Sequence, residues 1–445
     1  MRHLAEGSPR ITLGLIFLTC FFDVIGFSMI IPLMPYQMDF YLGEGASGSF
    51  LTRATVSLID FLSGGKADAT FAGLFFGGLM AFLFAIFQFL SAPFWGAASD
   101  RFGRRPMLLL TVALTCVAHA VWMFGGTIEV FLLARVLTGM MAGNISVATA
   151  AVADVTSSEG RARGMTAVGL AYSMGFIAGP VLGGFFGSVN LLQYWSDAPA
   201  LGLHPFSIAA ASTLLLSLVN LVGLFYCFPE TLKEADRVPR MARIAETGRS
   251  IFVGAPSRSI RLMSSVFFVF LLVYAGVEFG IAFLASDRFN LDVLETSLLY
   301  GGMGISQLIS QFVVLPRLVQ WGSERRTAMM GLVLTALGIA GTGLAQFPAF
   351  FAFSLITMAF GGGLVFPTVM ALASLMVERN EQGAMLGLFR SRGDLGQAFG
   401  PLLVSLTMLA LSGYAFLVFA LLLCLPLRWL DDLRSKKKRA LAEAG

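Results

Sequence analysis

The chain has 445 residues and a formal net charge of +4, with 57% hydrophobic and only 13% charged residues. It carries more apolar side chains than one soluble core can bury and too few charges to solvate a surface, so the composition indicates a membrane protein. The basic residues lie in short clusters between long apolar runs and form no patch beside aromatic residues, so we expect no binding to nucleic acid.

Twelve apolar segments are long enough to cross a bilayer as helices, since about 20 residues span the roughly 30 Å hydrocarbon core. The predicted spans are residues 13–35, 71–95, 106–125, 128–153, 164–188, 205–228, 260–285, 293–316, 326–345, 348–376, 384–411 and 413–430. Strands of a membrane barrel would be about ten residues long with alternating polarity, so the sequence predicts an all-α membrane protein. The first span contains Asp23 and ends without an A-x-A site, so we expect it to remain in the mature chain.

The positive residues predict the orientation of the spans. If both termini are cytoplasmic, 24 of the 30 Lys and Arg residues lie on the cytoplasmic side. Three lie outside, at Arg53, Lys66 and Arg288, and three lie within spans, at Arg135, Arg390 and Arg392. This distribution satisfies the positive-inside rule, so we expect a multi-pass protein of the cell (inner) membrane with both termini in the cytoplasm.

Three ionisable side chains lie deep in predicted spans, where a charge is costly and therefore suggests a function. Asp23 lies in span one, Arg135 in span four and Glu278 in span seven. A carboxylate that loses its water at such a depth can take and release a proton near neutral pH, whereas a nearby arginine favours its ionised form. We therefore expect these residues to couple transport to protons, with a purely structural ion pair as the alternative.

One long polar segment divides the chain into two halves of six spans each. The predicted halves are residues 1–229 and 260–445, and the cytoplasmic linker between them is 230–259. A shift of 221 positions places Gly175, Gly179 and Pro180 of the first half on Gly396, Gly400 and Pro401 of the second. Parallel repeats of six spans are a transporter architecture, with the substrate site between the halves near the middle of the membrane.

The first half resembles the major facilitator superfamily in several motifs. The loop GAASDRFGRR, 96–105, is similar to the superfamily's signature between spans two and three, and its matching residues are Gly96, Asp100, Arg101, Gly103, Arg104 and Arg105. Arg135, Gly139 and Gly143 are similar to the span-four motif, and GFIAGPVLGG, 175–184, is similar to the span-five motif of antiporters. FFDVIGFSMIIPLMP and FPET resemble the twelve-span drug:proton antiporters, including tetracycline exporters, although the equivalent loop of the second half lacks Asp-Arg. The resemblance implies the major facilitator fold of twelve helices.

The loop 96–105 together with Asp154 is expected to form a gating latch. A transporter that opens alternately to the two sides must hold one side closed by contacts weak enough to break. Asp100 can cap the N-terminus of a helix in the other half, such as span eleven, through the helix dipole. Arg104 can pair with Asp154 at the cytoplasmic end of span four. The alternative is a topology signal in a solvated turn, which explains the arginines but not Asp100 or the two glycines.

Span five is expected to pack closely against a neighbouring helix. The small residues that permit this approach are Gly175, Gly179, Gly183 and Gly184, and Pro180 permits a bend. Such packing would seal the outer side of the transporter, with ordinary close packing as the alternative.

Polar residues inside the spans are candidates for the wall of a substrate cavity. Arg390 and Asp394 in span eleven are four residues apart, so they share a helix face and can form a buried pair that suits a polar or charged substrate. Arg390 could instead extend to the cytoplasmic surface. The further candidates are Gln88, Asn144, Gln307, Gln311 and Gln397. His119 is expected to be a packed histidine.

The sequence carries no signature of an enzyme or a metal protein. It lacks HExxH, GxSxG and a nucleotide-binding glycine-rich loop with lysine. Its four cysteines, Cys20, Cys116, Cys227 and Cys424, have no CxxC spacing, which predicts neither a disulfide nor a metal site. We therefore expect a proton gradient, and no cofactor, to drive transport.

We therefore expect a monomeric secondary transporter that exports a small amphipathic compound in exchange for protons, by alternating access. A proton symporter or a uniporter for a sugar, an organic acid or a lipid would keep the same fold and latch. A channel or a receptor would not need a latch.

Overall fold

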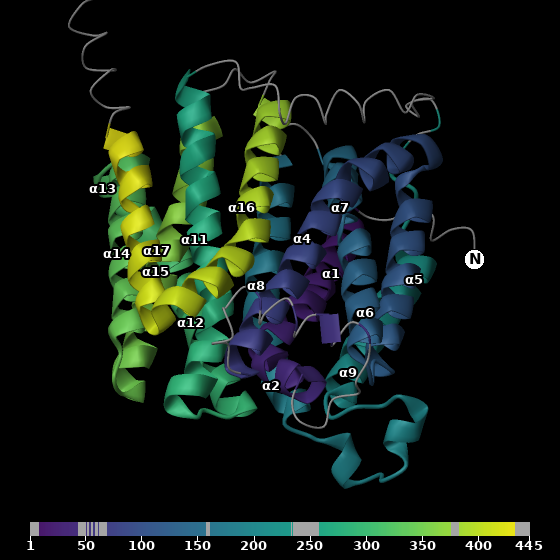
Figure 1. The fold of residues 1–445 in the computed structure, drawn as a ribbon. Helices are drawn as coiled ribbons and strands as arrows, with labels where there is room; N and C mark the ends of the chain where they lie inside the picture. The colour runs from purple at the N-terminus through teal and green to yellow at the C-terminus, as the bar shows by residue number, and fades with distance from the viewer. Residues whose placement is uncertain are drawn as a thin grey trace, which may run out of the picture. The chain divides into compact units, whose positions relative to one another are not determined.

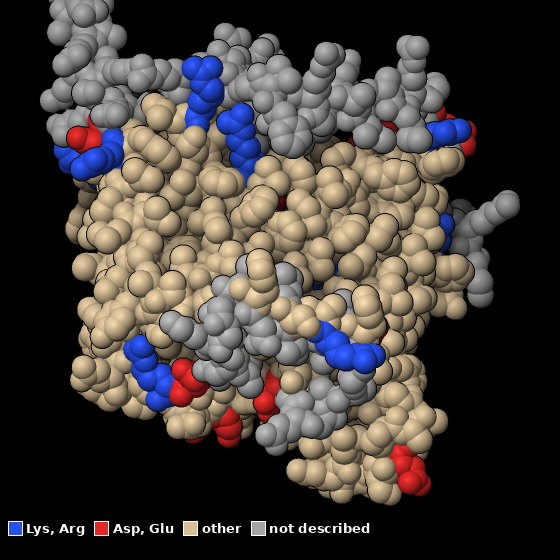
Figure 2. Space-filling view, in the orientation of Figure 1, with Lys and Arg blue, Asp and Glu red and all other residues tan. Residues whose placement is uncertain are grey.

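The computed structural model describes residues 9–42, 69–156, 161–232, 258–374 and 382–431, together with residues 50, 53, 54, 57, 61 and 234. Within these ranges the chain is helical, without strands, and eleven helices are long and apolar enough to cross a membrane. In Figure 2 most of the charged side chains lie toward the top and the bottom of the view, and few lie on the surface between them. The protein is therefore a multi-pass membrane protein.

The described helices divide between two compact units. One unit comprises Met1–Thr247 and Asp292–Gly301, and the other comprises Gly248–Leu291 and Gly302–Gly445. The division falls within the predicted linker 230–259, and the start of the eighth span groups with the first unit. Most of the linker, 235–257, lies outside the described residues.

The first unit contains the first six spans (Figure 1). Its helices are α1 (Pro9–Ser28), α2 (Ile30–Leu42), α4 (Ala69–Phe102), α5 (Arg104–Met123), α6 (Ile128–Ala142), α7 (Ile145–Val155), α8 (Arg161–Gly187) and α9 (Ser207–Cys227). Two short 3₁₀ helices, Leu191–Gln193 and Ala198–Leu201, lie between α8 and α9.

Two spans of the first unit are interrupted, and each interruption has a local cause. Pro32 has no N–H to donate to the carbonyl of Ser28, and span one breaks into α1 and α2 at this point. Span four breaks into α6 and α7 at Gly143 and Asn144, where the N–H of Asn144 donates to the carbonyl of Met141 in a tight turn. The second break places Asn144 in the middle of its span with its side chain free to turn toward α1.

The second unit repeats the helical pattern. Its helices are α11 (Arg258–Phe289), α12 (Val293–Ile309), α13 (Leu315–Trp321), α14 (Glu324–Leu344), α15 (Pro348–Ser374), α16 (Gln382–Leu411) and α17 (Ala415–Leu422), with a π-helical turn at Ser310–Val314 joining α12 to α13. The start of α12 belongs to the first unit in the division above.

The predicted spans eleven and twelve form one continuous run of 41 residues, Ser391–Asp431, which is why eleven helices stand where twelve spans are expected. A 3₁₀ turn at Ser412–Tyr414 joins α16 to α17, and α17 packs against α14. About 20 residues suffice for one crossing, so this run is long enough for two.

Candidate functional site

A carboxylate and an amide meet in the middle of the first unit. Asp23 lies on α1, half-way along the first span, and its Oδ2 accepts a hydrogen bond of 2.8 Å from Nδ2 of Asn144. Asn144 reaches Asp23 because it stands at the break between α6 and α7. The predicted proton-coupling carboxylate is therefore held by one of the predicted cavity residues.

Arg135 on α6 lies beside this pair but is only 3% exposed. Its guanidinium carbon lies 4.6 Å from the centre of the Phe84 ring, and its Nε has no hydrogen-bond acceptor among the described residues. Phe84 in turn stacks on Phe27 of α1, with ring centres 4.6 Å apart. Among the residues that the structure describes, the positive charge of Arg135 thus lies over an aromatic face and pairs with no carboxylate.

These groups line a recess in the first unit, which we call the central recess. Its lining residues are Asp23, Gly26, Phe27, Phe84, Thr115, His119, Arg135, Thr138 and Ala142. It has room for a group of about the size of one water molecule and is partly open. Asp23 and Arg135 share it, yet within the described part of the chain no ion pair joins them.

His119 is a packed histidine with polar partners on α9. Its ring is 4% exposed, and Nδ1 lies 3.0 Å from the hydroxyl of Ser217 on α9. It also packs on Gly26 of α1, where a Cβ atom would lie 3.1 Å from the ring. His119 therefore forms one wall of the central recess, a place that the sequence pattern did not indicate.

The other predicted cavity residues are distributed between the two units. Gln88 on α4 donates a weak hydrogen bond of 3.5 Å from Nε2 to the carbonyl of Ala142, next to the recess. Gln307 lies on α12, Gln311 in the π-helical turn, and Asp394 and Gln397 on α16, all half-buried in the second unit. Glu278, which the sequence predicted as a proton-coupling residue, is half-buried on α11 of the same unit. The side chain of Arg390 lies outside the described residues, so its pairing with Asp394 stays a prediction.

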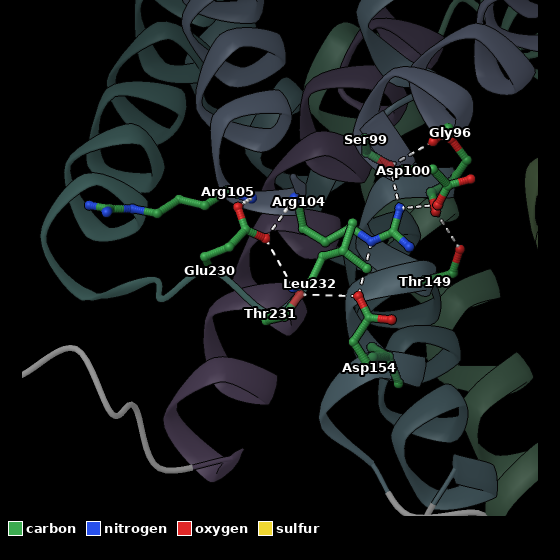
Figure 3. A network of polar contacts seen from close by, with 12 residues as sticks. Gly96, Ser99, Asp100, Arg104, Arg105, Thr149, Asp154, Glu230, Thr231 and Leu232 are labelled. Carbon is green, nitrogen blue, oxygen red and sulfur yellow. Dashed lines mark hydrogen bonds and ion pairs between the residues drawn. The ribbon is translucent and has the colours of Figure 1, made fainter. Parts of the chain in front are cut away.

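A network of charges occupies the N-terminus of α5 (Figure 3). Arg104 is 6% exposed, and its Nε donates to Oδ2 of Asp154 at 2.9 Å. Its Nη1 donates to Oδ1 of Asp100 and to the hydroxyl of Ser99, each at 2.6 Å. The Arg104–Asp154 ion pair expected from the sequence is present, and Asp100 joins it. The cap that we expect Asp100 to place on a helix of the other half stays a prediction.

The remaining residues of the predicted latch have local roles. Gly103 adopts a φ of 101°, a conformation that favours glycine, and a Cβ atom there would collide with Glu230. Gly96 accepts a hydrogen bond from Ser99 at its carbonyl, and Arg101 is exposed over the ring of Phe102. Arg105 donates from Nη2 to the carbonyl of Phe225 near the C-terminus of α9. Residues 96–102, predicted as a loop, thus form the C-terminal end of α4, residues 104 and 105 begin α5, and Gly103 alone separates the two helices.

Glu230 completes this network and was missed from the sequence. Its Oε1 accepts from the backbone N–H of Arg104 at 2.8 Å, and its Oε2 accepts from that of Arg105 at 3.3 Å. The first N–H groups of α5 have no acceptor within the helix, and the carboxylate of Glu230 accepts their hydrogen bonds. Its negative charge also interacts favourably with the positive end of the helix dipole. The next residue, Thr231, donates to Asp154 at 3.3 Å. The motif FPET marked this segment, but nothing in the sequence connected it to the loop 96–105.

Three comparisons with known proteins bear on this arrangement. The model of the Major Facilitator Superfamily matches residues 16–326 and 265–445 of the chain. The chain is 27% identical to major facilitator superfamily domain-containing protein 10 of Mus musculus, over 94% of this chain and 92% of the relative. It is 29% identical to the class C tetracycline resistance protein of Escherichia coli, over 78% of this chain and 85% of the relative.

The fold is also similar to solved structures. The crystal structure of the human organic anion transporter MFSD10 (TETRAN) superimposes with a TM-score of 0.74 at 25% identity, covering 95% of this chain and 99% of that one. A D-xylose-proton symporter superimposes with a TM-score of 0.68 at 15% identity, which shows the fold alone.

Proposed function

The chain belongs to the major facilitator superfamily and is a transporter, not an enzyme, and we propose that it is proton-coupled and exports a small amphipathic compound in exchange for protons. The proposal places the exchange at the central recess of the first unit. It assigns the chain to the cell (inner) membrane, with both termini in the cytoplasm and the monomer as the working unit. The proton gradient is the driving force.

The observation that carries the proposal is the placing of Asp23 in the central recess. A carboxylate in a membrane span costs free energy and is a candidate for proton transfer. Asp23 is held by a neutral amide, Asn144, and faces a recess that Arg135 also lines. A polar or positively charged group of the compound and a proton then compete for the same carboxylate, and this competition supports exchange.

The relatives support export more than import. Their names include tetracycline resistance proteins of Escherichia coli and Vibrio anguillarum and a multidrug resistance protein of Bacillus subtilis. The similar human structure is named an organic anion transporter, so the relatives do not indicate whether the exported compound is a cation or an anion. For the second unit, we propose Glu278 as a further proton-coupling residue and, for the cavity wall, Gln307, Gln311, Asp394 and Gln397.

Alternating access requires contacts that close one side, and we propose the loop 96–105 with Asp154 for the cytoplasmic side. The ion pairs of Arg104 with Asp100 and Asp154 supply a charged cluster at that end of the first unit. The glycine face of α8 supplies close packing at the outer end.

Transport into proteoliposomes with an imposed pH difference tests the proposal. The probes are tetracycline and a naphthalene derivative with a quaternary ammonium group, whose fixed charge prevents passive accumulation. We expect both to accumulate in the acidic compartment. Asp23→Asn should abolish accumulation and weaken counterflow, because the amide mimics only the protonated carboxylate, with which the compound does not associate. Asp39→Asn, on the exposed end of α2, is the matched control. Unchanged accumulation in Asp23→Asn would falsify the assignment.

A further inference from the structure

We infer that Arg135 binds the negatively charged group of anionic amphipathic compounds, and that such compounds travel together with a proton and not against it. The inference rests on the proposed proton-coupled transport at the central recess. It adds a second class of compound, for which the direction of coupling is reversed.

Arg135 is a buried cation whose hydrogen-bonding capacity is not fully used. It is 3% exposed, keeps its positive charge at neutral pH, and its Nε has no hydrogen-bond acceptor among the described residues. A buried charge without a partner is strongly unfavourable, and the face of Phe84 compensates only in part. An oxyanion on the planar fork of the guanidinium would supply the missing acceptors.

The central recess provides space and matching chemistry for that group. Besides Arg135, the hydroxyl-bearing residues Thr115 and Thr138 line it, and the stacked rings of Phe27 and Phe84 form an apolar wall. The recess is partly open and too small for a whole drug-sized compound. It therefore admits one oxygen of a carboxylate or sulfonate group, while the rest of that group and the apolar body of the compound lie outside it.

The charge of Asp23 sets the sign of the coupling. When Asp23 is ionised, the recess already contains one negative charge to balance Arg135, and a second anion is repelled. When Asp23 takes a proton, only the charge of Arg135 remains, and the anion binds more strongly. By linkage, the bound anion must strengthen proton binding by the same factor. An anion and a proton are therefore carried together.

Other titratable groups near Asp23 could also make the binding of the anion depend on pH. The titratable or charged side chains that the structure describes there are His119 and Cys116 on α5 and Arg135 on α6. The faces of α8 and α9 toward α1 carry glycines and Asn220, which bonds Thr19. Of these residue types, only histidine ordinarily changes its charge near neutral pH, so His119 requires its own variant.

The experiment uses the purified full chain with naphthalene sulfonate and naphthalene sulfonamide, which share a body and differ in charge. We expect the sulfonate to bind more tightly at acidic than at alkaline pH, and its binding to draw protons from a weakly buffered solution. The sulfonamide should do neither. In proteoliposomes the sulfonate should accumulate in the alkaline compartment, opposite to the quaternary ammonium probe.

Three variants assign the effect to residues. Arg135→Gln should weaken sulfonate binding by about tenfold or more and leave sulfonamide binding unchanged. Arg261→Gln, an exposed cation on α11, is the matched control and should change neither. Asp23→Asn should bind the sulfonate at all pH values as tightly as the native chain does in acid, without proton uptake. His119→Gln should retain the uptake.

Equal losses of sulfonate and sulfonamide binding in Arg135→Gln would show a structural role and overturn the inference. Proton release on sulfonate binding, or uptake that depends on His119 and persists in Asp23→Asn, would overturn the coupling. Failure of the ammonium probe to accumulate, with the Arg135 result intact, would refute only the proposed exchange.

Discussion

The single residue His204 attaches the loop between α8 and α9 to the end of α5. It lies between α8 and α9, is fully buried, and its Nε2 donates to the carbonyl of Trp122 at 2.9 Å near the end of α5. Its Nδ1 accepts from the N–H of Phe206 at 3.3 Å. Both ring nitrogens are therefore used by the neutral form, and a second proton would break one bond.

The burial of His204 predicts a loss of stability in acid. Burial lowers the pKa of His204 from 6.5 to about 4, although its bond to Trp122 opposes the shift. Below about pH 6.5, His204 is protonated in the unfolded chain but stays neutral in the native chain. The free energy of unfolding therefore falls by about 1 kcal/mol for each pH unit of acidification until the native pKa is reached. Thermal unfolding in detergent over this range measures the slope.

The matched variant is His204→Gln, whose amide can still donate and accept but does not titrate. Its stability should depend less on pH than that of the native chain in the same window. Parallel curves for the two proteins would show that His204 does not carry the effect.

The residues of the site differ in how far the sequence could predict them. Asp23 and Arg135 were found because a charge inside an apolar span is conspicuous, and Asn144 because it interrupts one. The contact of Asn144 with Asp23 was not predictable, since it depends on the break at Gly143 that turns Asn144 toward α1. Glu230 was missed because a capping carboxylate from another helix leaves no pattern near the helix that it caps.

At the scale of helices, each unit packs its first and fifth spans through glycines. In the first unit, Gly179 on α8 lies against the backbone of Ile25 and Met29 and the hydroxyl of Ser28, all at the end of α1. In the second unit, Gly400 on α16 lies against the backbone of Leu272 and Gly276 on α11. The equivalence of Gly179 and Gly400 was read from the sequence as a shift of 221 positions, and both contact the first helix of their own half.

Because the helices touch at these glycines, a single methyl group should separate them. Gly179→Ala places a Cβ atom against the backbone of α1, so we expect it to destabilise the chain by about 1–3 kcal/mol. Gly169→Ala, on the same helix, meets nothing within 4 Å and should be neutral or stabilising by up to about 1 kcal/mol. The midpoints of thermal unfolding compare the two. Equal midpoints for the two variants would show that α8 and α1 can accommodate a methyl group at Gly179.

At the scale of the whole molecule, composition and loop charges sufficed to predict a multi-pass helical protein. They predicted two spans where the structure has the single run Ser391–Asp431, because the Ser-Gly-Tyr turn between α16 and α17 is itself a 3₁₀ helix and not an open loop. They also placed the latch without its partner Glu230. In the described structure, the loop 96–105 contacts the segment Phe225–Leu232, where the first half leads into the linker.

This connection makes Asp100 the residue with which to test the latch. Asp100 accepts a hydrogen bond of 2.6 Å from Arg104, and we expect its charge also to cap a helix of the other half while the cytoplasmic side is closed. Asp100→Asn removes the charge and should weaken the closed state by about 1 kcal/mol, which lowers the population of the outward-open form about fivefold. Turnover should fall, whereas the affinity for the compound in detergent should stay the same, because the central recess is formed by other residues.

Spin labels near Thr156 on the first half and Ala384 on the second report whether the cytoplasmic side opens. In Asp100→Asn we expect the distance distribution to shift toward longer values than in the native chain. Asp197→Asn, an exposed carboxylate in the loop between α8 and α9, is the control and should leave the distribution unchanged. If Asp100→Asn loses transport with an unaltered distribution, the loop 96–105 serves folding or insertion and does not act as a latch.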